Sequence, residues 1–534
     1  MALPLVLMKQ LQPFPDTSEI YNPLSLSLLL LILLLTLVHL LKLSRSSNKL
    51  NLPPSPPRLP IIGNLHQILQ NVPHRSLKAL SDRYGPIMLV YFGNSPSLVV
   101  SSAEVASEMM KTHDIAFSNR PRSIATKILL YDGKDLGFAE YGEYWRQLRK
   151  ICVLELLSNK RVKSAQHIRV EEVSCLINKI RRSCINVHGR STINLSEMIL
   201  AVSNNIASRC IFGRKVEDEE EENGSGESKF GELTKKYPIL LASTCVGDLY
   251  PSLKWIDFLT GSIGHLHKTA RDLGDLVDQV IEEHRITLTD DDKKDFIHVL
   301  LQLQKDGNDG IEVTQDTLKA ILMASTNLSS SDMFVAGTDT AATTLEWMMA
   351  ELLKNPSIMK RAQKEVRGVV KGKLVIDMKD LDQMEYLKCV IKESLRLHAS
   401  APLLLPRETR ECVKLRGYDI PAKTRVFVNA WAIQRDPKLW DRPKEFLPER
   451  FENSPIDYKG QDFQFIPFGS GRRSCPGISF AVTAVEYVIA NILYWFDWKL
   501  PDGPVEENLD MSEATGLTLQ RKSPLLVVPT VYSP

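Results

Sequence analysis

The segment from Pro467 to Gly477 most strongly limits what this chain of 534 residues can be. It reads Pro-Phe-Gly-Ser-Gly-Arg-Arg-Ser-Cys-Pro-Gly, so Cys475 lies among glycine and proline residues. The apolar stretch Ile478–Tyr494 follows directly and predicts a helix. Glycine permits positive φ and close approach of the backbone to a flat group, and proline stiffens a turn. The segment therefore predicts a rigid loop that presents one thiolate at the start of a helix.

Such a loop suits an iron ligand. Backbone N–H groups and the positive end of the following helix favour a thiolate over a thiol. Arg473 can donate charge-assisted hydrogen bonds to a carboxylate such as a haem propionate, and a thiolate on haem iron favours cleavage of dioxygen. The alternative is a buried structural cysteine, the commoner role of a lone cysteine. The fixed offsets of Phe468, Gly471, Arg473, Cys475 and Gly477 favour the iron ligand.

The pattern Phe-x-x-Gly-x-Arg-x-Cys-x-Gly resembles the haem-binding loop of the cytochrome P450 family, and the apolar N-terminal stretch and the proline-rich segment after it resemble the family's plant microsomal members. The resemblance covers roughly residues 50–530. It implies a mainly α-helical fold with a small β region (α+β), haem b bound through Cys475, and Phe468, Arg473, Gly471 and Gly477 around the haem. For the β region, Ile87–Phe92 and Ser97–Val100 predict a hairpin.

A second segment, Phe-Val-Ala-Gly-Thr-Asp-Thr at 334–340, resembles the part of the family that handles dioxygen. Ala336 and Gly337 are small enough to leave a groove in a helix. Asp339 and Thr340 are the predicted catalytic residues, because an acid and an alcohol can deliver protons to bound oxygen. Taken alone, the same residues suit a helix with a notch for packing.

Trp145 and Arg149 are four residues apart and share one face of a predicted helix. The alternative is an ordinary amphipathic helix. Beside the cysteine loop, the pair resembles the helix that binds the haem propionates in the family. The resemblance adds Arg407 as a further propionate partner.

Glu393 and Arg396 are three residues apart, so they face the same way on a helix. A surface ion pair is the common explanation of such a spacing. Together with Arg450, they resemble the family's Glu-Arg-Arg triad. The triad has a structural role, because it would lock the core behind the cysteine loop.

The segment Ala401–Arg407 resembles the strand that lines the substrate pocket. The predicted lining is apolar and consists of Ala336, Gly337, Leu403, Leu404, Leu405 and Leu517. An apolar lining favours a small lipophilic substrate. By resemblance to plant relatives, a terpenoid, a phenylpropanoid or an alkaloid precursor would fit, and the sequence does not choose among them.

Residues 24–41 carry no formal charge and are long enough to span a bilayer. Lys42, Arg45 and Lys49 follow, which places the downstream domain in the cytoplasm. We expect an irregular extension at 1–23, a single-pass anchor in the endoplasmic reticulum membrane at 24–41, a basic and proline-rich hinge at 42–60, and a catalytic domain at 61–534. A cleaved signal peptide is disfavoured, because no small-residue cleavage pattern follows.

Net charge and cysteine spacing exclude some classes of ligand and cofactor. The net charge is +2, so the sequence does not suggest nucleic acid as a ligand. The eight cysteines are scattered without a C-x-x-C pair, which indicates neither a disulfide framework nor a zinc site. The resemblance instead implies O2 and NADPH–cytochrome P450 reductase as partners of a monooxygenase.

Residues 324–331 (Ala-Ser-Thr-Asn-Leu-Ser-Ser-Ser) look inserted relative to the family. Eight extra helical residues would lengthen a helix by about 12 Å and turn its faces by about 80°. We hypothesise retained intron sequence or a gene-model error, which transcript sequencing decides. The insertion leaves open a non-catalytic haem protein, and a haem-thiolate isomerase or dehydratase that needs no dioxygen is a separate alternative. Thr340 argues against that alternative.

Overall fold

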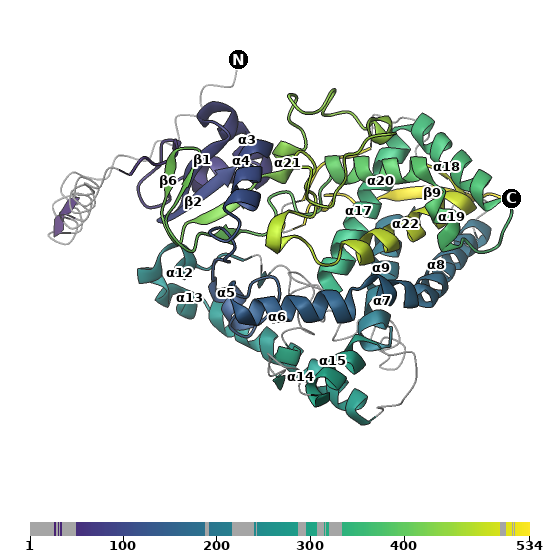
Figure 1. The fold of residues 1–534 in the computed structure, drawn as a ribbon, viewed down its shortest axis with the longest axis horizontal. Coiled ribbons are helices and arrows are strands. Elements are labelled where there is room, and N and C mark those ends of the chain that lie inside the picture. Colours follow the sequence, from purple (N-terminus) through teal and green to yellow (C-terminus); the bar gives the residue numbers. More distant parts are fainter. Residues whose placement is uncertain are drawn as a thin grey trace, which may run out of the picture. The chain divides into compact units, whose positions relative to one another are not determined.

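Figure 1 presents the fold as a computed structural model. The structure describes residues 50–186, 192–215, 240–241, 243–286, 295–306, 314–315, 317–319, 334–501, 509–514, 516 and 518–533, with five positions between 26 and 34. The chain divides into two units, Met1–Asn51 and Leu52–Pro534. In the first unit, the five described positions of the predicted anchor are helical and exposed. The rest of that anchor, the extension at 1–23 and the insertion at 324–331 lie outside the described residues.

Helices dominate the second unit, as the sequence predicts. The α-helices are α2 (Leu65–Ile68), α3 (Pro73–Tyr84), α4 (Ala103–Ser107), α5 (Ile124–Leu129), α6 (Glu143–Ile151), α7 (Asn159–Ser164), α8 (Gln166–Asn186), α9 (Leu195–Phe212), α12 (Val246–Leu249), α13 (Trp255–Leu259), α14 (Ser262–Ile286), α15 (Phe296–Asp306), α17 (Phe334–Lys354), α18 (Pro356–Val370), α19 (Met378–Asp382), α20 (Glu385–Leu397), α21 (Ala430–Ile433) and α22 (Ile478–Trp495). Short π or 3₁₀ turns are η2 (Glu108–Thr112), η3 (Cys152–Leu156), η4 (Pro251–Leu253), η5 (Pro448–Phe451) and η6 (Gly471–Arg473).

The β region is small and divides into separate sheets. Its strands are β1 (Ile87–Phe92), β2 (Ser95–Val100), β3 (Ile193–Asn194), β4 (Arg407–Glu408), β5 (Val413–Leu415), β6 (Tyr418–Ile420), β7 (Arg425–Val428), β8 (Phe496–Lys499) and β9 (Leu526–Val531). The largest sheet has the order β1-β2-β7-β4, and the other two have the orders β3-β9-β8 and β5-β6. β1 and β2 pair antiparallel from Ile87↔Val100 to Phe92↔Ser95, which confirms the predicted hairpin.

The core is helical. α22 packs against α17, α20, α18 and α8, and most of its residues are buried. A helix that is apolar all round is typical of such a central position. Within the described residues, α22 alone is long and apolar enough to cross a membrane, and its burial marks it as a core helix. In Figure 1, the sheet of β1 and β2 lies apart from this group of helices. The loop before α22 and the adjacent α17 therefore meet at the centre of the unit.

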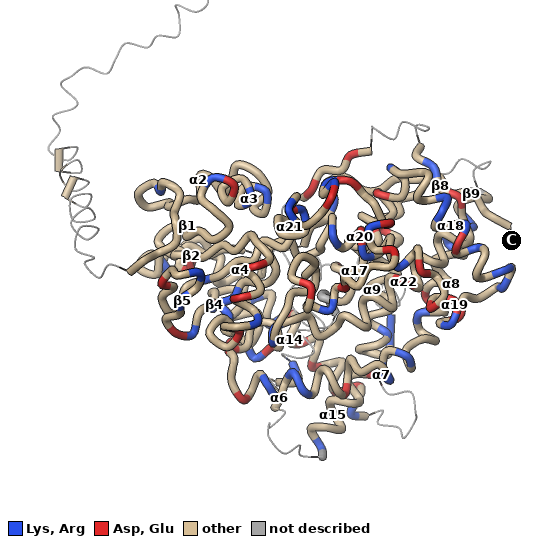
Figure 2. The backbone as a smooth tube through the Cα atoms, turned by 45° about the horizontal axis from the view of Figure 1, so that its top comes forward, with Lys and Arg blue, Asp and Glu red and all other residues tan. Residues whose placement is uncertain are grey.

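The proline-rich stretch joins the folded unit at Leu52. Pro53 and Pro56 are buried, and the amide of Leu89 on β1 donates to the carbonyl of Pro54 at 2.8 Å. The part of the predicted hinge from Leu52 onwards thus packs on the sheet. In the view of Figure 2, basic and acidic residues are interspersed along the described chain.

The C-terminal segment is tied to the N-terminal helix α3 through Glu513. Its Oε2 atom accepts a hydrogen bond from Arg75 Nε at 2.6 Å and lies 3.0 Å from His74 Nε2. Burial alone would raise the pKa of Glu513, but the hydrogen bonds from His74 and Arg75 outweigh it and lower that pKa to about 2. Ionised Glu513 therefore stabilises the fold above its unfolded pKa of 4.5, and this stabilisation is lost as the pH falls toward 2.

We expect Glu513→Gln to lower the free energy of unfolding at pH 7 by about 3 kcal/mol, since each unit of pKa shift is about 1.4 kcal/mol. Denaturant unfolding of both proteins between pH 7 and pH 3 measures this. The difference between wild type and variant should shrink as the pH falls, because protonation removes the same charge. A difference that stays constant over this range would contradict the assignment.

Candidate active site

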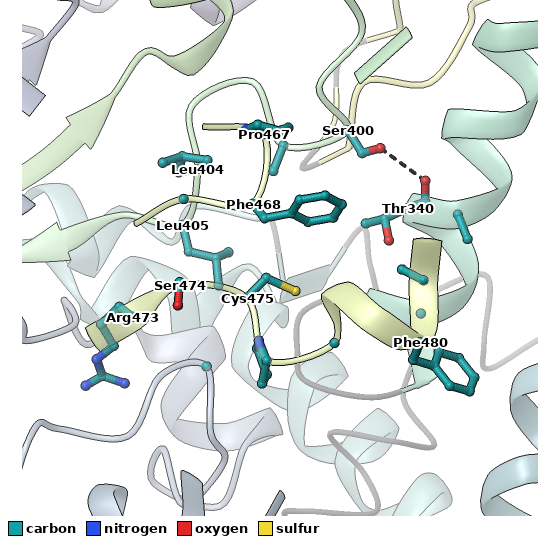
Figure 3. A pocket seen from close by; sticks show the side chains of 18 of the residues that line it. Thr340, Ser400, Leu404, Leu405, Pro467, Phe468, Arg473, Ser474, Cys475 and Phe480 are labelled. Carbon is teal, nitrogen blue, oxygen red and sulfur yellow. Dashed lines mark hydrogen bonds between the residues drawn. The ribbon is translucent and has the colours of Figure 1, made fainter. Parts of the chain in front are cut away.

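A largely apolar cavity lies between the cysteine loop, the middle of α17 and the segment that leads into β4. Cys475 lines it from the loop, and Thr340 and Gly337 line it from α17. Figure 3 shows the sulfur of Cys475 pointing into the open space, whereas the guanidinium of Arg473 points away from it. The structure thus brings the predicted metal ligand and the predicted catalytic threonine to one cavity.

The loop conformation depends on short-range hydrogen bonds. The amide of Cys475 donates to the carbonyl of Phe468 at 2.9 Å, and the amide of Ser474 donates to the carbonyl of Gly471 at 3.0 Å. Gly469 and Gly471 have φ values of +70° and +71°, which glycine adopts without strain. These turns hold the partly exposed thiol of Cys475 at the cavity wall, and Pro476 follows it directly.

The two predicted cofactor-binding glycines have different roles. Gly477 lines the cavity, as expected, but its φ of −91° is not in the left-handed region. Gly471 does not line the cavity. A Cβ atom at Gly471 would lie 2.6 Å from both Asp114 Oδ1 and the carbonyl oxygen of Met110. Gly471 is therefore required by packing against η2 and by its positive φ, and its contact with a haem stays a prediction.

Four arginines line the cavity: Arg120, Arg149, Arg407 and Arg473. Arg407 donates to the carbonyl of Ser470 at 2.7 Å and pairs with Asp114 at 3.3 Å. Burial lowers the pKa of Arg407, and the charge of Asp114 acts in the opposite direction. No aspartate or glutamate lines the cavity among the residues that the structure describes.

Arg473 and Trp145 form the wall beside the loop. Arg473 donates to the carbonyls of Ser118, at 2.8 Å, and of Leu136 and Ala139. Its guanidinium carbon lies 4.3 Å from the centroid of the Trp145 ring, whose Nε1 also donates to Leu136. These contacts fix Arg473 to the backbone of the preceding segments. Arg149, on the same helix as Trp145, reaches Ser474 Oγ at 3.3 Å.

The donor set fits a haem. A thiol, apolar walls, several guanidinium groups and an absence of lining carboxylates suit a flat apolar group that carries its own carboxylates and a metal. Arg120 is a member of this set that the sequence analysis missed. It donates to the carbonyls of Gly137, Leu405 and Pro406. Only the tertiary fold brings Arg120 close to residues so distant in sequence. No motif in the neighbouring sequence identifies Arg120 as a cavity residue.

On the opposite wall, the backbone carbonyl of Thr340 accepts from the hydroxyl groups of Ser400 and Thr344. Ser400 Oγ donates to the carbonyl of Thr340 at 3.1 Å and lies 3.0 Å from Thr344 Oγ1 (Figure 3). A Cβ atom at Gly337 would lie 3.4 Å from the ring of Phe480, an ordinary van der Waals contact, so Gly337 packs beside this ring. Ser400 and Phe480 also line the cavity and were not predicted.

Asp339 does not line the cavity beside Thr340. Successive residues on a helix point about 100° apart, so the two side chains face different directions. Asp339 accepts hydrogen bonds from Thr518 Oγ1 at 2.7 Å and from Gln520 Nε2 at 2.6 Å. Burial raises the pKa of Asp339, and these hydrogen bonds act in the opposite direction. Thr518 itself lines the cavity, so Asp339 reaches it through this hydroxyl.

The predicted triad is assembled in the core. Glu393 contacts Arg396 at 2.7 Å and Arg450 at 3.1 Å, and the first two side chains are 0% exposed. Arg396 also donates to the carbonyl of Gln434 at 2.8 Å. The side chain of Gln434 in turn accepts from the amide of Ile466, the residue before the cysteine loop. The triad is therefore connected to the loop by hydrogen bonds.

The apolar lining is partly as expected. Leu404 and Leu405 line the cavity, but Leu403 packs instead against the cluster that contains Met88 and Val99. Leu404 has a φ of +52°, so this segment turns and is not a regular strand; β4 begins only at Arg407. The placement of Leu403 in the lining was therefore wrong. Leu517 and the side chain of Ala336 lie outside the described residues.

Comparisons with known proteins show which family the chain belongs to. The cytochrome P450 family model matches residues 53–528. Phenylacetaldehyde oxime monooxygenase of Prunus mume is 52% identical over 92% of this chain and 91% of the relative. Cytochrome P450 71A1 of Persea americana is 50% identical over 87% and 91%. A zebra fish cytochrome P450 solved with abiraterone has a TM-score of 0.70 at 26% identity, covering 86% of this chain and 99% of that one.

The fold and these comparisons define a member of a haem-thiolate protein family. The chain belongs to the cytochrome P450 family, and it is a plant cytochrome P450 monooxygenase. Family membership implies a haem-thiolate iron, a redox partner that supplies electrons, dioxygen and a small-molecule substrate.

Proposed function

We propose that this protein uses NADPH and O2 to hydroxylate or otherwise oxidise a small lipophilic plant metabolite. The cofactor is haem b with Cys475 as its thiolate ligand, and the electron donor is NADPH–cytochrome P450 reductase. The protein is anchored in the endoplasmic reticulum membrane by residues 24–41, with the catalytic domain in the cytoplasm. The observation that carries the proposal is the position of Cys475 and Thr340 on one apolar cavity that also holds arginine side chains.

The residues that line the cavity have different roles in binding the haem and the substrate. A haem bound here supplies the activation of dioxygen and the transfer of one oxygen atom to the substrate. Cys475 provides the thiolate, and Arg149 and Arg407 neutralise the haem carboxylates. The apolar walls, including Leu404 and Leu405, bind the substrate and exclude water.

Protons reach the oxygen site through hydroxyl groups. Thr340 holds a proton at its Oγ1 atom on the cavity wall. Asp339 and the Thr518 hydroxyl form a second hydrogen-bonded route to the same space, supported by their 2.7 Å contact. Because burial raises the pKa of Asp339, its carboxyl group is a better proton donor near neutral pH than an exposed aspartate.

The substrate class rests on similarity and on the lining. Relatives include a phenylacetaldehyde oxime monooxygenase, a desmethylyatein synthase (46% identical) and a strychnine-11-hydroxylase (45% identical). These names cover different metabolites, so they support a plant specialised metabolite without selecting one. A terpenoid, a phenylpropanoid or an alkaloid precursor each suits an apolar cavity of this kind.

Expression in microsomes with a plant reductase tests the proposal. We expect a thiolate-type ferrous–carbon monoxide spectrum, and NADPH-dependent products from a panel of lipophilic metabolites. Under ¹⁸O2, one labelled oxygen atom should enter the product. Product formed without NADPH would indicate the isomerase or dehydratase alternative. An intact spectrum with no turnover would indicate the non-catalytic haem protein.

Replacing Thr340 by alanine should separate oxygen consumption from product formation. The thiolate spectrum should stay, because the substitution leaves Cys475 in place, whereas product formed per NADPH should fall by about a hundredfold, the lower range of a general acid's contribution. The matched control is Thr343→Ala, since Thr343 is buried on the same helix and does not line the cavity. If both variants form the same amount of product per NADPH consumed, Thr340 does not deliver protons to the oxygen site.

A further inference from the structure

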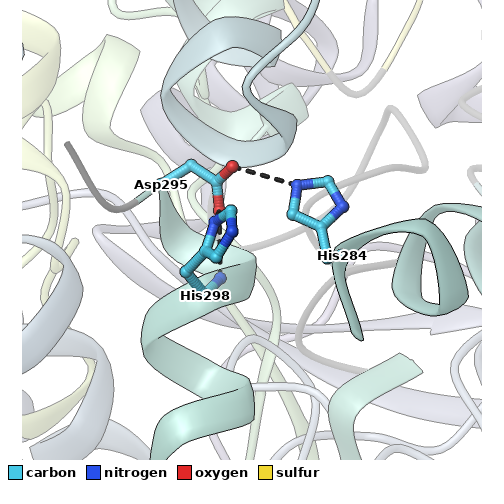
Figure 4. Close-up of side chains that lie close together, drawn as sticks. All are labelled: His284, Asp295 and His298. Carbon is cyan, nitrogen blue, oxygen red and sulfur yellow. Dashed lines mark hydrogen bonds and ion pairs between the residues drawn. The ribbon is translucent and has the colours of Figure 1, made fainter. Parts of the chain in front are cut away.

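A group of metal-ligating side chains lies outside the cavity, where α14 ends and α15 begins (Figure 4). His284 is in the last turn of α14, Asp295 directly precedes α15, and His298 is in the first turn of α15. None of the three lines the cavity described above. Their side chains are 11%, 9% and 17% exposed, in that order.

The imidazole rings of His284 and His298 both contact the carboxylate of Asp295. His284 Nε2 lies 3.0 Å from Asp295 Oδ2, and His298 Nδ1 lies 2.8 Å from Asp295 Oδ1. The two imidazole rings meet edge to face with centroids 4.8 Å apart. Two ligand atoms of a tetrahedral ion with bonds of about 2.1 Å are about 3.4 Å apart, so the His–Asp contacts, which are hydrogen bonds as they stand, would each lengthen by about half an ångström around an ion.

A backbone contact selects the nitrogen that His284 presents. Its Nδ1 atom lies 2.7 Å from the carbonyl oxygen of Val280. A carbonyl oxygen only accepts, so Nδ1 carries a proton and donates it there. With Nδ1 protonated, the contact between Nε2 and the carboxylate holds either a second proton, as in an imidazolium that donates to Asp295, or a metal ion that Nε2 ligates in the neutral ring. Histidines that ligate metals are oriented by this kind of outer hydrogen bond.

We propose that His284, Asp295 and His298 bind one divalent transition-metal ion of the Zn²⁺ class. Two imidazoles and one carboxylate are the ligand set that such ions accept, and hard cations such as Mg²⁺ and Ca²⁺ prefer oxygen ligands alone. Water completes the coordination, because the group is not fully buried. The proposal does not depend on the oxidative function.

Binding requires one side chain to move. The three ligand atoms lie within 4.8 Å of one another, and the widest gap must close to about 3.5 Å around one ion. His298 is the most exposed of the three and lies in the first turn of a helix, so rotation of its side chain can close the gap. Asp295 keeps its place because its Oδ1 atom also accepts the amide of His298 at 3.0 Å.

The ion would join the ends of three helices. It would tie the last turn of α14 to the first turn of α15, and Asp295 also meets the end of α9. A Cβ atom at Gly213, which follows α9 with a φ of +70°, would lie 2.8 Å from Asp295 Oδ2. A ligand that binds only the folded state raises its stability, so a bound ion would stabilise the contact between the ends of α14, α15 and α9, and chelation would reverse this effect.

The test uses haem-loaded protein stripped with a chelator and titrated with ZnCl2. We expect about one zinc per chain, with imidazole ligands in the zinc X-ray absorption spectrum and a raised unfolding temperature. His298→Phe keeps the ring contact with His284 but removes a ligand, and should weaken zinc affinity by about tenfold or more. The matched control is His267→Phe, because His267 is exposed on α14 and should leave binding unchanged.

Asp295→Asn provides a second variant if His298→Phe does not fold. Asparagine still caps α15 but lacks the charge that binds the ion, so affinity should fall in the same way. The ferrous–carbon monoxide spectrum of each variant reports whether the fold is intact. No stoichiometric zinc on the wild type, or equal zinc affinity in wild type and both folded variants, would overturn the proposal in favour of a hydrogen-bonded His–Asp–His cluster.

Discussion

Replacing Cys475 by alanine is expected to abolish the ferrous–carbon monoxide band that is characteristic of thiolate ligation. Alanine has no atom that can bind iron, and the cavity offers no second thiol among its described lining residues. Product formation with NADPH should fall on the order of a thousandfold or more, about 4 kcal/mol in activation free energy. Difference spectra and turnover assays on protein expressed with ample haem measure both effects.

The matched control is Cys412→Ala, because Cys412 is exposed and lies far from the loop in sequence. Its spectrum and turnover should equal those of the wild type. If the band survives in Cys475→Ala, the iron ligand is another residue and the mechanism proposed here is wrong.

Glu393→Gln should cause the largest loss of stability. The substitution removes the only carboxylate among the three triad residues and leaves the buried guanidinium of Arg396 without its countercharge. Breaking a buried ion pair on one side typically costs about 3–5 kcal/mol. We therefore expect little folded haem protein at 37 °C, which the yield of the thiolate spectrum measures.

Glu385→Gln is the control on the same helix. Glu385 pairs with Lys388 at 2.8 Å with the same spacing of three residues, but its side chain is 78% exposed. Exposed ion pairs contribute about 0–1 kcal/mol, so this variant should fold normally. Similar yields for the two variants would show that burial of the triad does not matter for folding.

Features that depend on local spacing were predictable from the sequence. The cysteine loop, the hairpin of β1 and β2, and the helix that begins at Ile478 follow from residue types within a few positions of one another. The contact between Glu393 and Arg396 also follows from helical spacing. In each case, the backbone conformation is set by neighbouring residues, so the pattern carries the information.

Features that depend on distant segments were not predictable in the same way. Asp339 turns to Thr518 and Gln520, which lie near the other end of the chain, and Arg120 meets carbonyls beyond position 400. Leu403 packs against the cluster of Met88 and Val99, and Leu404 has a positive φ, neither of which a run of leucines reveals. The sequence names candidate residues, but side-chain directions come from the tertiary fold.

The segment around Thr518 has a consequence for how enzymes of this kind diversify. It borders the cavity, holds Asp339, and accepts a hydrogen bond from Trp347 of α17 at the carbonyl of Leu519. An exchange at Thr518 that admits a new metabolite also disturbs a buried acid. Substitutions in the segment around Thr518 therefore affect both substrate preference and the stability of the fold. Directed evolution of this segment will need compensating substitutions on α17.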